Sequence, residues 1–148
     1  MSLLERVSGE LKAAMLARDA ERLSTLRLLK SAIGYAQIER QTEALSDPEV
    51  IALIQKEIKK RRDAIEQYEK GARSELASRE KQEIGVLESF LPSPLSAEEL
   101  EQLVRAAIQE TGAASKKQMG PVIKAVQAKV AGRAEGRVIS ELVGKLLP

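Results

Sequence analysis

The chain has 148 residues, 43% hydrophobic and 31% charged, with a formal net charge of +2 and neither cysteine nor histidine. This composition predicts a soluble helical protein and excludes disulfides, thiolate or imidazole catalysis and ordinary zinc sites, while three aromatic residues are too few for base-stacking RNA modules. No apolar run is long enough to span a membrane and no secretory signal core is recognisable, so we expect a cytoplasmic protein without a membrane partner.

The first two helices follow from apolar residues that recur every three or four positions. One stripe runs from Leu4 to Ala14, and a broader one predicts a second helix from about Asp19 to Arg40. Gly34 lies inside this second helix, where glycine costs about 1 kcal/mol relative to alanine. We therefore expect a neighbouring helix to pack closely against Gly34.

A third helix begins with a strong start signal, since Ser46 and Glu49 fit a capping box with Pro48 in the first turn. Its apolar residues keep helical spacing until Gly71. Arg61 falls on this apolar stripe, and we expect its guanidinium either to reach solvent or to pair with a carboxylate from a neighbouring helix.

The segment Pro92-Ser93-Pro94 is the clearest boundary in the chain. Its first proline would clash with a preceding helical turn, so a fourth helix that starts near Leu76 ends near Leu91. We expect an all-α protein with a four-helix N-terminal subdomain, residues 1–91, and a three-helix C-terminal subdomain, residues 95–148, joined by a Pro-Ser-Pro hinge.

Three shorter helical patterns follow this boundary. The first begins at a second capping box at Ser96 and ends at Gly112. A proline leaves two alternatives for the next helix, which either kinks at Gly120-Pro121 or begins near Met119. The last helix runs from about Glu135 to Leu147.

Positive charge gathers at the C-terminal end of the sequence. Residues 1–91 carry 16 basic and 16 acidic side chains, residues 92–114 one basic and four acidic, and residues 115–148 seven basic and two acidic. A basic run at 56–62 is largely neutralised by acidic residues four positions away. Lysines, arginines and helix N-termini suit phosphate oxygens and attract nucleic acid through counterion release; the alternative is a solvated face. The candidate nucleic-acid-binding residues are Lys116, Lys117, Lys124, Arg133 and Arg137.

No catalytic pattern stands out in the sequence. Without histidine or cysteine the usual nucleophile–base pairs cannot form, and no glycine-rich loop precedes a lysine. Glu80 and Glu83 share a helix face, where such a pair is usually solvated or salt-bridged rather than a Mg²⁺ site. We predict no catalytic residue, no metal site and no cofactor.

Several short motifs keep their order and spacing along nearly the whole chain. They are Ser24-Thr25-Leu26-Arg27-Leu28-Leu29, Arg61-Arg62-Asp63-Ala64-Ile65-Glu66-Gln67-Tyr68, Phe90-Leu91-Pro92, Leu95-Ser96-Ala97-Glu98-Glu99-Leu100 and Gly132-Arg133-Ala134-Glu135-Gly136. Together they resemble the YqeY family, which is related to the C-terminal tail domain of GatB, a subunit of tRNA-dependent aspartyl/glutamyl amidotransferase. The resemblance implies a helical N-terminal subdomain joined to a small three-helix subdomain. Glu135 departs from it, since the family commonly has Asp there, which is a better helix N-cap.

The resemblance also implies a function, because in GatB the corresponding tail helps bind the body of tRNA while other domains transfer the amide. We therefore expect a non-catalytic module that binds tRNA or a similar structured RNA through its C-terminal subdomain. A similarity-based label would be carbon–nitrogen ligase with glutamine as amido-N-donor, although the residues predict no independent activity. Two alternatives remain: a helical protein–protein adaptor that uses the electrically neutral residues 1–91, and an amidotransferase accessory factor that needs partner subunits.

Overall fold

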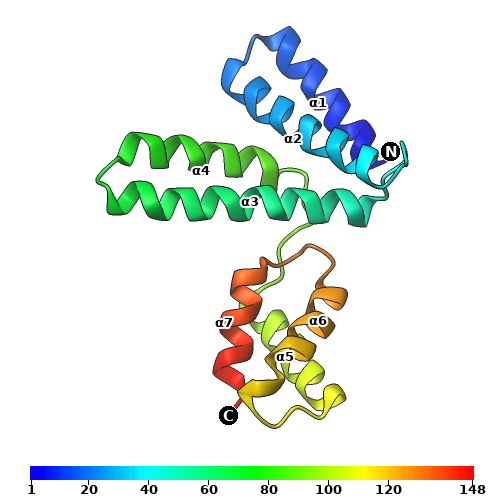
Figure 1. Cartoon of the computed structure of the whole chain (residues 1–148), viewed down its shortest axis with the longest axis vertical. Helices are drawn as coiled ribbons and strands as arrows, with labels where there is room; N and C mark the ends of the chain where they lie inside the picture. The colour runs from blue at the N-terminus through cyan, green and yellow to red at the C-terminus, as the bar shows by residue number, and fades with distance from the viewer. The chain divides into compact units, whose positions relative to one another are not determined.

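The computed structural model describes the whole chain from Met1 to Pro148, and its regular elements are seven α-helices and one short 3₁₀ turn (Figure 1). The all-α fold class expected from the sequence is confirmed. None of the helices combines the length and the apolar character needed to cross a bilayer. The chain divides into two compact units, residues Met1–Leu91 (unit 1) and Pro92–Pro148 (unit 2).

Unit 1 is made of two helical hairpins. The helices α1 (Leu3–Ala17) and α2 (Ala20–Glu39) form one hairpin, and α3 (Asp47–Lys70) and α4 (Ser74–Glu88) form the other. The two helices of each hairpin lie side by side in Figure 1. Their apolar stripes meet in one core, which buries residues from every helix of the unit. Its largest fully buried side chains are Leu26, Leu29, Ile54, Ile58, Leu87 and Phe90.

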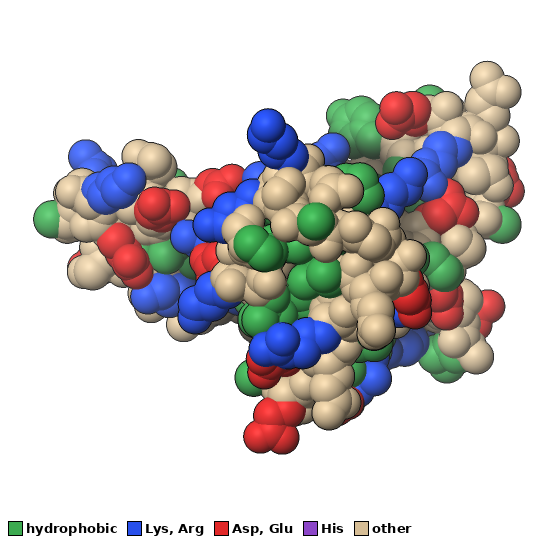
Figure 2. Space-filling view, turned by 90° about the horizontal axis from the view of Figure 1, so that it is seen from below, with side chains coloured by type: hydrophobic (Ala, Val, Ile, Leu, Met, Phe, Trp, Pro, Cys, Tyr) green, Lys and Arg blue, Asp and Glu red, His purple; other side chains and the backbone are tan.

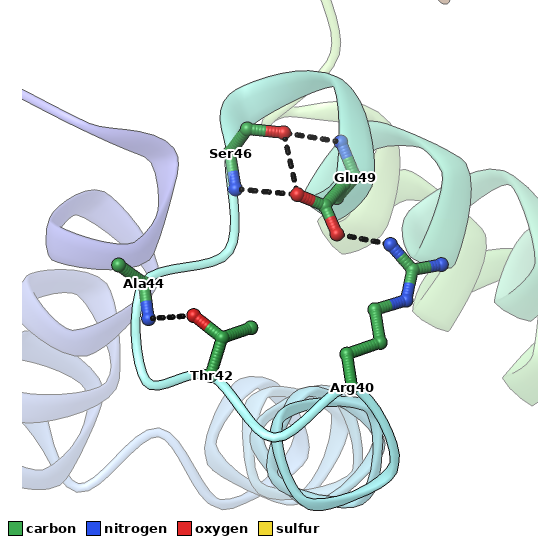
Figure 3. A network of polar contacts seen from close by, with 5 residues as sticks. All are labelled: Arg40, Thr42, Ala44, Ser46 and Glu49. Atoms are coloured by element: carbon green, nitrogen blue, oxygen red, sulfur yellow. Dashed lines mark hydrogen bonds and ion pairs between the residues drawn. The ribbon is translucent and has the colours of Figure 1, made fainter.

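The start of α3 confirms the predicted capping box (Figure 3). The Ser46 hydroxyl accepts a hydrogen bond from the Glu49 backbone N–H at 3.3 Å, and the Glu49 carboxylate accepts one from the Ser46 N–H at 3.2 Å. The second oxygen of Glu49 pairs with Arg40 at the end of α2. The Ser46 backbone N–H, then its hydroxyl and Arg40, hold the pKa of Glu49 below its ordinary value. The Glu49 carboxylate therefore both caps the start of α3 and connects it to the preceding helix.

Arg61 is buried on the α3 stripe and pairs with carboxylates, as one of the two sequence-based alternatives predicted. Its Nε donates to Glu83 of α4 at 3.1 Å, and its Nη1 donates to the Glu57 carbonyl at 3.1 Å. The Glu57 carboxylate lies 3.6 Å from the same Nη1. A buried cation thus joins α3 to α4. On the same helix as Glu83, the pKa of Glu80 is raised above its ordinary value, first by partial burial and then by the nearby charge of Glu83.

Two sequence-based expectations about unit 1 are wrong. Helix α4 ends at Glu88 rather than near Leu91, because the N–H groups of Phe90 and Leu91 bond carbonyls three residues back, which tightens the last turn and buries the Phe90 ring. A Cβ placed on Gly34 would meet nothing within 4 Å, so no helix of this chain packs closely there.

Unit 2 is a three-helix unit with an entirely apolar interior. Helix α5 (Ala97–Thr111) is followed by a 3₁₀ turn, η1 (Lys116–Gln118), and then by α6 (Met119–Val130) and α7 (Gly136–Leu146). The buried residues come from all three helices. They are Leu100, Val104, Ala107, Val122, Val126, Val130, Ile139, Val143 and Leu147.

The second of the two alternatives for α6 is the one observed. The helix begins at Met119, directly after η1. Pro121 therefore lies in the first turn, where backbone N–H groups have no intrahelical partner and a missing one costs little. Helix α5 starts with the Ser96 hydroxyl accepting from the Glu99 N–H at 3.1 Å and ends at Gly112, whose φ is 67°.

Candidate nucleic-acid interface

Helices α6 and α7, which carry Lys124 and Arg137 and flank the other candidate residues, run antiparallel. A Cβ on Gly144, near the end of α7, would lie 3.6 Å from the Cε of Met119, the first residue of α6. A Cβ on Gly136, at the start of α7, would lie 3.6 Å from the side-chain nitrogen of Gln127. The start of α6 therefore meets the end of α7, and the predicted residues divide between the two ends of this pair.

Three of the five predicted residues have exposed ammonium groups without a carboxylate partner. Lys116 and Lys117 lie on η1, and Lys124 lies on the exposed side of α6. None of the ion pairs or side-chain hydrogen bonds in unit 2 involves these lysines. Lys124 follows Lys117 by seven positions, from the turn that leads into α6 to the middle of that helix. These three residues form the lysine row, the part of the candidate site in which charge is available to a ligand.

Arg133 has a structural role that the sequence did not indicate. Its Nε donates to the Ser93 carbonyl at 2.8 Å, and its own carbonyl accepts from the Leu95 N–H at 2.9 Å. These two bonds tie the loop between α6 and α7 to the segment that precedes α5. Arg133 is half-buried, so part of its hydrogen-bonding capacity is already used within unit 2.

Arg137 lies in the first turn of α7 and has a weak internal partner. Its Nε is 3.7 Å from a carboxylate oxygen of Glu141, and both side chains are exposed. An exposed pair of this kind contributes about 0.3–0.5 kcal/mol at most, so a phosphate could displace Glu141. Lys129, by contrast, is held by both oxygens of Glu110 from α5 at 2.8 Å.

Sequence reasoning missed Lys145. It is exposed, has no ion-pair partner, and follows Gly144 at the end of α7 that meets the start of α6. The short connection between α6 and α7 could have indicated this, because short loops join antiparallel helices and would bring the ends of residues 116–124 and 136–146 together.

The side chains at the starts of α6 and α7 leave backbone donors uncapped. Gln118 and Glu135 precede these helices, and neither makes a side-chain cap hydrogen bond. The Gln118 side chain instead accepts from the Ala114 N–H at 2.6 Å. First-turn N–H groups without a side-chain cap can bond water or an anion.

On the face shown in Figure 2, Lys and Arg side chains are interspersed with carboxylates and hydrophobic side chains. No group of three or more Asp and Glu side chains is placed to hold a metal ion. The arrangement can therefore bind an anionic surface through individual cations.

Comparison with known proteins places these features in context. The family model described as Yqey-like protein matches residues 4–147. An uncharacterized protein of Schizosaccharomyces pombe is 37% identical over 90 residues, which cover 61% of this chain and 72% of the relative. The protein of Pyrenophora tritici-repentis named "Altered inheritance of mitochondria protein 41, mitochondrial" is 30% identical over 148 residues, covering 97% of this chain and 77% of the relative. Its namesake in Lachancea thermotolerans is 38% identical over 82 residues, covering 55% and 44% respectively.

These relatives correct the expected cytoplasmic location, which is wrong on this comparison because several of them are named as mitochondrial proteins. The expectation came from excluding a secretory signal and a membrane span. A charged helical module of this kind is equally compatible with any aqueous compartment, and organelle import depends on separate amphipathic, arginine-rich segments. The properties of the folded module therefore do not determine its location in the cell.

Proposed function

This chain belongs to the YqeY family, and from that premise we propose that it is a non-catalytic module that binds structured RNA, tRNA first of all, through its phosphates. The lysine row carries the proposal. Lys116, Lys117 and Lys124 present charge that the fold does not use, whereas Arg105 and Lys129 of the same unit are already paired with carboxylates.

Unpaired cations are the ones that contribute most to RNA affinity. A lysine that already holds a carboxylate must give up that partner before it binds a phosphate, while an unpaired lysine only releases its counterions. Lys145 would extend this contact at the start of α6, whereas Arg137 and the loop held by Arg133 lie at the other end of the helix pair and would make a second contact. The three aromatic residues, Tyr35, Tyr68 and Phe90, all belong to unit 1. Recognition by unit 2 would thus depend on backbone and shape rather than on base stacking.

The link to amide transfer is part of the same proposal. The likeness to the tail of GatB supports tRNA as the class of RNA, and it favours a module that holds tRNA while another protein performs the chemistry. The names of the relatives make the mitochondrion the first compartment in which to search for that RNA.

The test is the salt dependence of tRNA binding by the full chain. Folded tRNA is titrated by fluorescence anisotropy at several salt concentrations, with the wild type and with the triple variant Lys116→Glu, Lys117→Glu, Lys124→Glu. Each lost phosphate contact lowers the slope of log K against log salt by about 0.7–0.9, so the triple variant should lose roughly two to three in slope and at least about tenfold in affinity.

A charge-matched control separates a site from general attraction. Lys56→Glu, Lys59→Glu and Lys60→Glu make the same change in charge on exposed positions of α3 in unit 1. Little effect of this control on binding would support the proposal. Equal weakening by both triple variants, or wild-type affinity that does not respond to salt, would overturn it.

A further inference from the structure

A hollow of about 450 Å³ lies between the start of α2 and one face of α4 in unit 1. The α2 side supplies Asp19 and residues of the first two helical turns, and the α4 side supplies residues spaced by three and four positions. The buried Thr25 and the half-buried Val86 belong to its lining, and Val86 packs against the core of the unit. Small-molecule sites are typically hollows of roughly 300–1,000 Å³ that combine such apolar walls with a few polar groups.

Two sequence motifs that RNA binding by unit 2 does not explain meet at this hollow. Ser24 and Thr25, from the first motif, line it directly, and the exposed Ser24 hydroxyl makes no hydrogen bond. Arg61, from the second motif, donates to Glu83 at 3.1 Å and so holds the Glu83 carboxylate in the wall of the hollow. Residues that are far apart in the sequence therefore shape one space between α2 and α4.

Arg79 is the one cation of the lining that has no partner. It is exposed, and no ion pair or hydrogen bond involves it, although Glu75 and Glu83 lie four positions away on α4, where ion pairs form along a helix. The other cation of the lining, Arg22, pairs with Glu10 of α1 at 2.9 Å. A ligand carboxylate would therefore find a free guanidinium at Arg79.

Three carboxylates of the lining favour positive charge in the same ligand. Glu21 is exposed and has no ion pair, and Asp19 uses one oxygen to cap α2. Glu83 shares its cation, Arg61, with another carboxylate. The charge of Glu83 still raises the pKa of the neighbouring Glu80, after partial burial, so Arg61 does not neutralise it fully.

We propose that this hollow binds a free basic α-amino acid, lysine or arginine, with its carboxylate on Arg79, its α-ammonium on Glu83 and its side-chain cation on Glu21. Arg79 and Glu83 are neighbours on one helix face, as the two charged groups on the α-carbon of an amino acid are. A residue inside a peptide lacks both of these charges, which favours the free amino acid. The three carboxylates would repel a phosphate backbone, so this site is separate from the RNA proposal for unit 2.

The first experiment uses L-lysine and two analogues that each lack one of its groups. The isotope-labelled full chain is titrated to millimolar concentrations of ligand and followed by nuclear magnetic resonance. Lysine should bind saturably, with the largest shift changes at residues 19–25 and 79–86. Cadaverine lacks the carboxylate and ε-aminocaproate lacks the α-ammonium, so each should bind at least about tenfold more weakly, because a charged hydrogen bond is lost.

The second experiment changes the free charges of the hollow. Arg79→Gln should weaken lysine binding at least about tenfold and leave the melting temperature unchanged, since Arg79 is exposed and unpaired. Glu21→Gln should weaken it several-fold. Lys81→Gln is the control, because it makes the same change in charge on another face of α4, where Lys81 pairs with Glu69.

Four results would overturn the proposal of an amino-acid site. They are no saturable binding of lysine, shift changes centred outside the two segments, an analogue that binds as tightly as lysine, and equal weakening by Arg79→Gln and Lys81→Gln. None of these results bears on RNA binding by the lysine row, which lies in unit 2.

Discussion

The two units of the molecule use their charged side chains in opposite ways. In unit 1, Arg61 is buried and shared between Glu57 and Glu83, so the charge holds two helices together. In unit 2, no charged residue is buried, and the lysine row stays at the surface without partners. A basic run in a sequence can therefore be structural or available to a ligand. The role depends on whether a neighbouring helix supplies a carboxylate partner.

Removing the buried cation of unit 1 should cause the largest loss of stability. Arg61→Ala would leave Glu57 and Glu83 partly buried without their shared cation, at a cost of about 3 kcal/mol to the free energy of unfolding of unit 1. Urea unfolding followed by circular dichroism measures this. Lys59→Ala is the control, since the exposed Lys59 is 3.7 Å from Asp63 and should cost less than about 0.5 kcal/mol. A similar cost for both variants would mean that Arg61 contributes no more than a surface pair.

We propose that the two units unfold independently. Weakening one helix cap in each unit tests this and should have an effect of intermediate size on stability. Ser46→Ala removes the hydroxyl that accepts from the Glu49 N–H, and Ser96→Ala removes its counterpart at Glu99. Each should cost about 1 kcal/mol. Hydrogen exchange measured by mass spectrometry should show faster exchange only in α3 and its neighbours for the first, and only in unit 2 for the second. Faster exchange throughout the chain in either variant would contradict independent unfolding.

The smallest expected effect concerns Glu80. Its pKa in the folded chain lies above the ordinary value, so the ionised carboxylate reduces stability at neutral pH. That penalty disappears as the pH falls below the ordinary pKa of glutamate, because Glu80 is then protonated in both the folded and the unfolded chain. Glu80→Gln should therefore raise the melting temperature slightly at pH 7 and leave it unchanged near about pH 4. A gain that is the same at both pH values would point to packing rather than ionisation.

The sequence by itself determined the helices and most of their ends. The capping box at Ser46, the end of α5 at Gly112 and the start of α6 near Met119 all depend on residues at most four positions apart, which a local pattern contains. Local patterns also determined the order of the helices and the position of Pro92–Pro94 between α4 and α5.

Only the tertiary structure decided what each charged or small residue does. Arg133 bonds Ser93, 40 positions away, and Lys129 pairs with Glu110, 19 positions away, so neither partner lies within a local pattern. The open space over Gly34 likewise depends on where the other helices pack. Helix formation is governed by short-range hydrogen bonds and apolar spacing, whereas ion pairing and exposure depend on segments that folding brings together from distant parts of the chain.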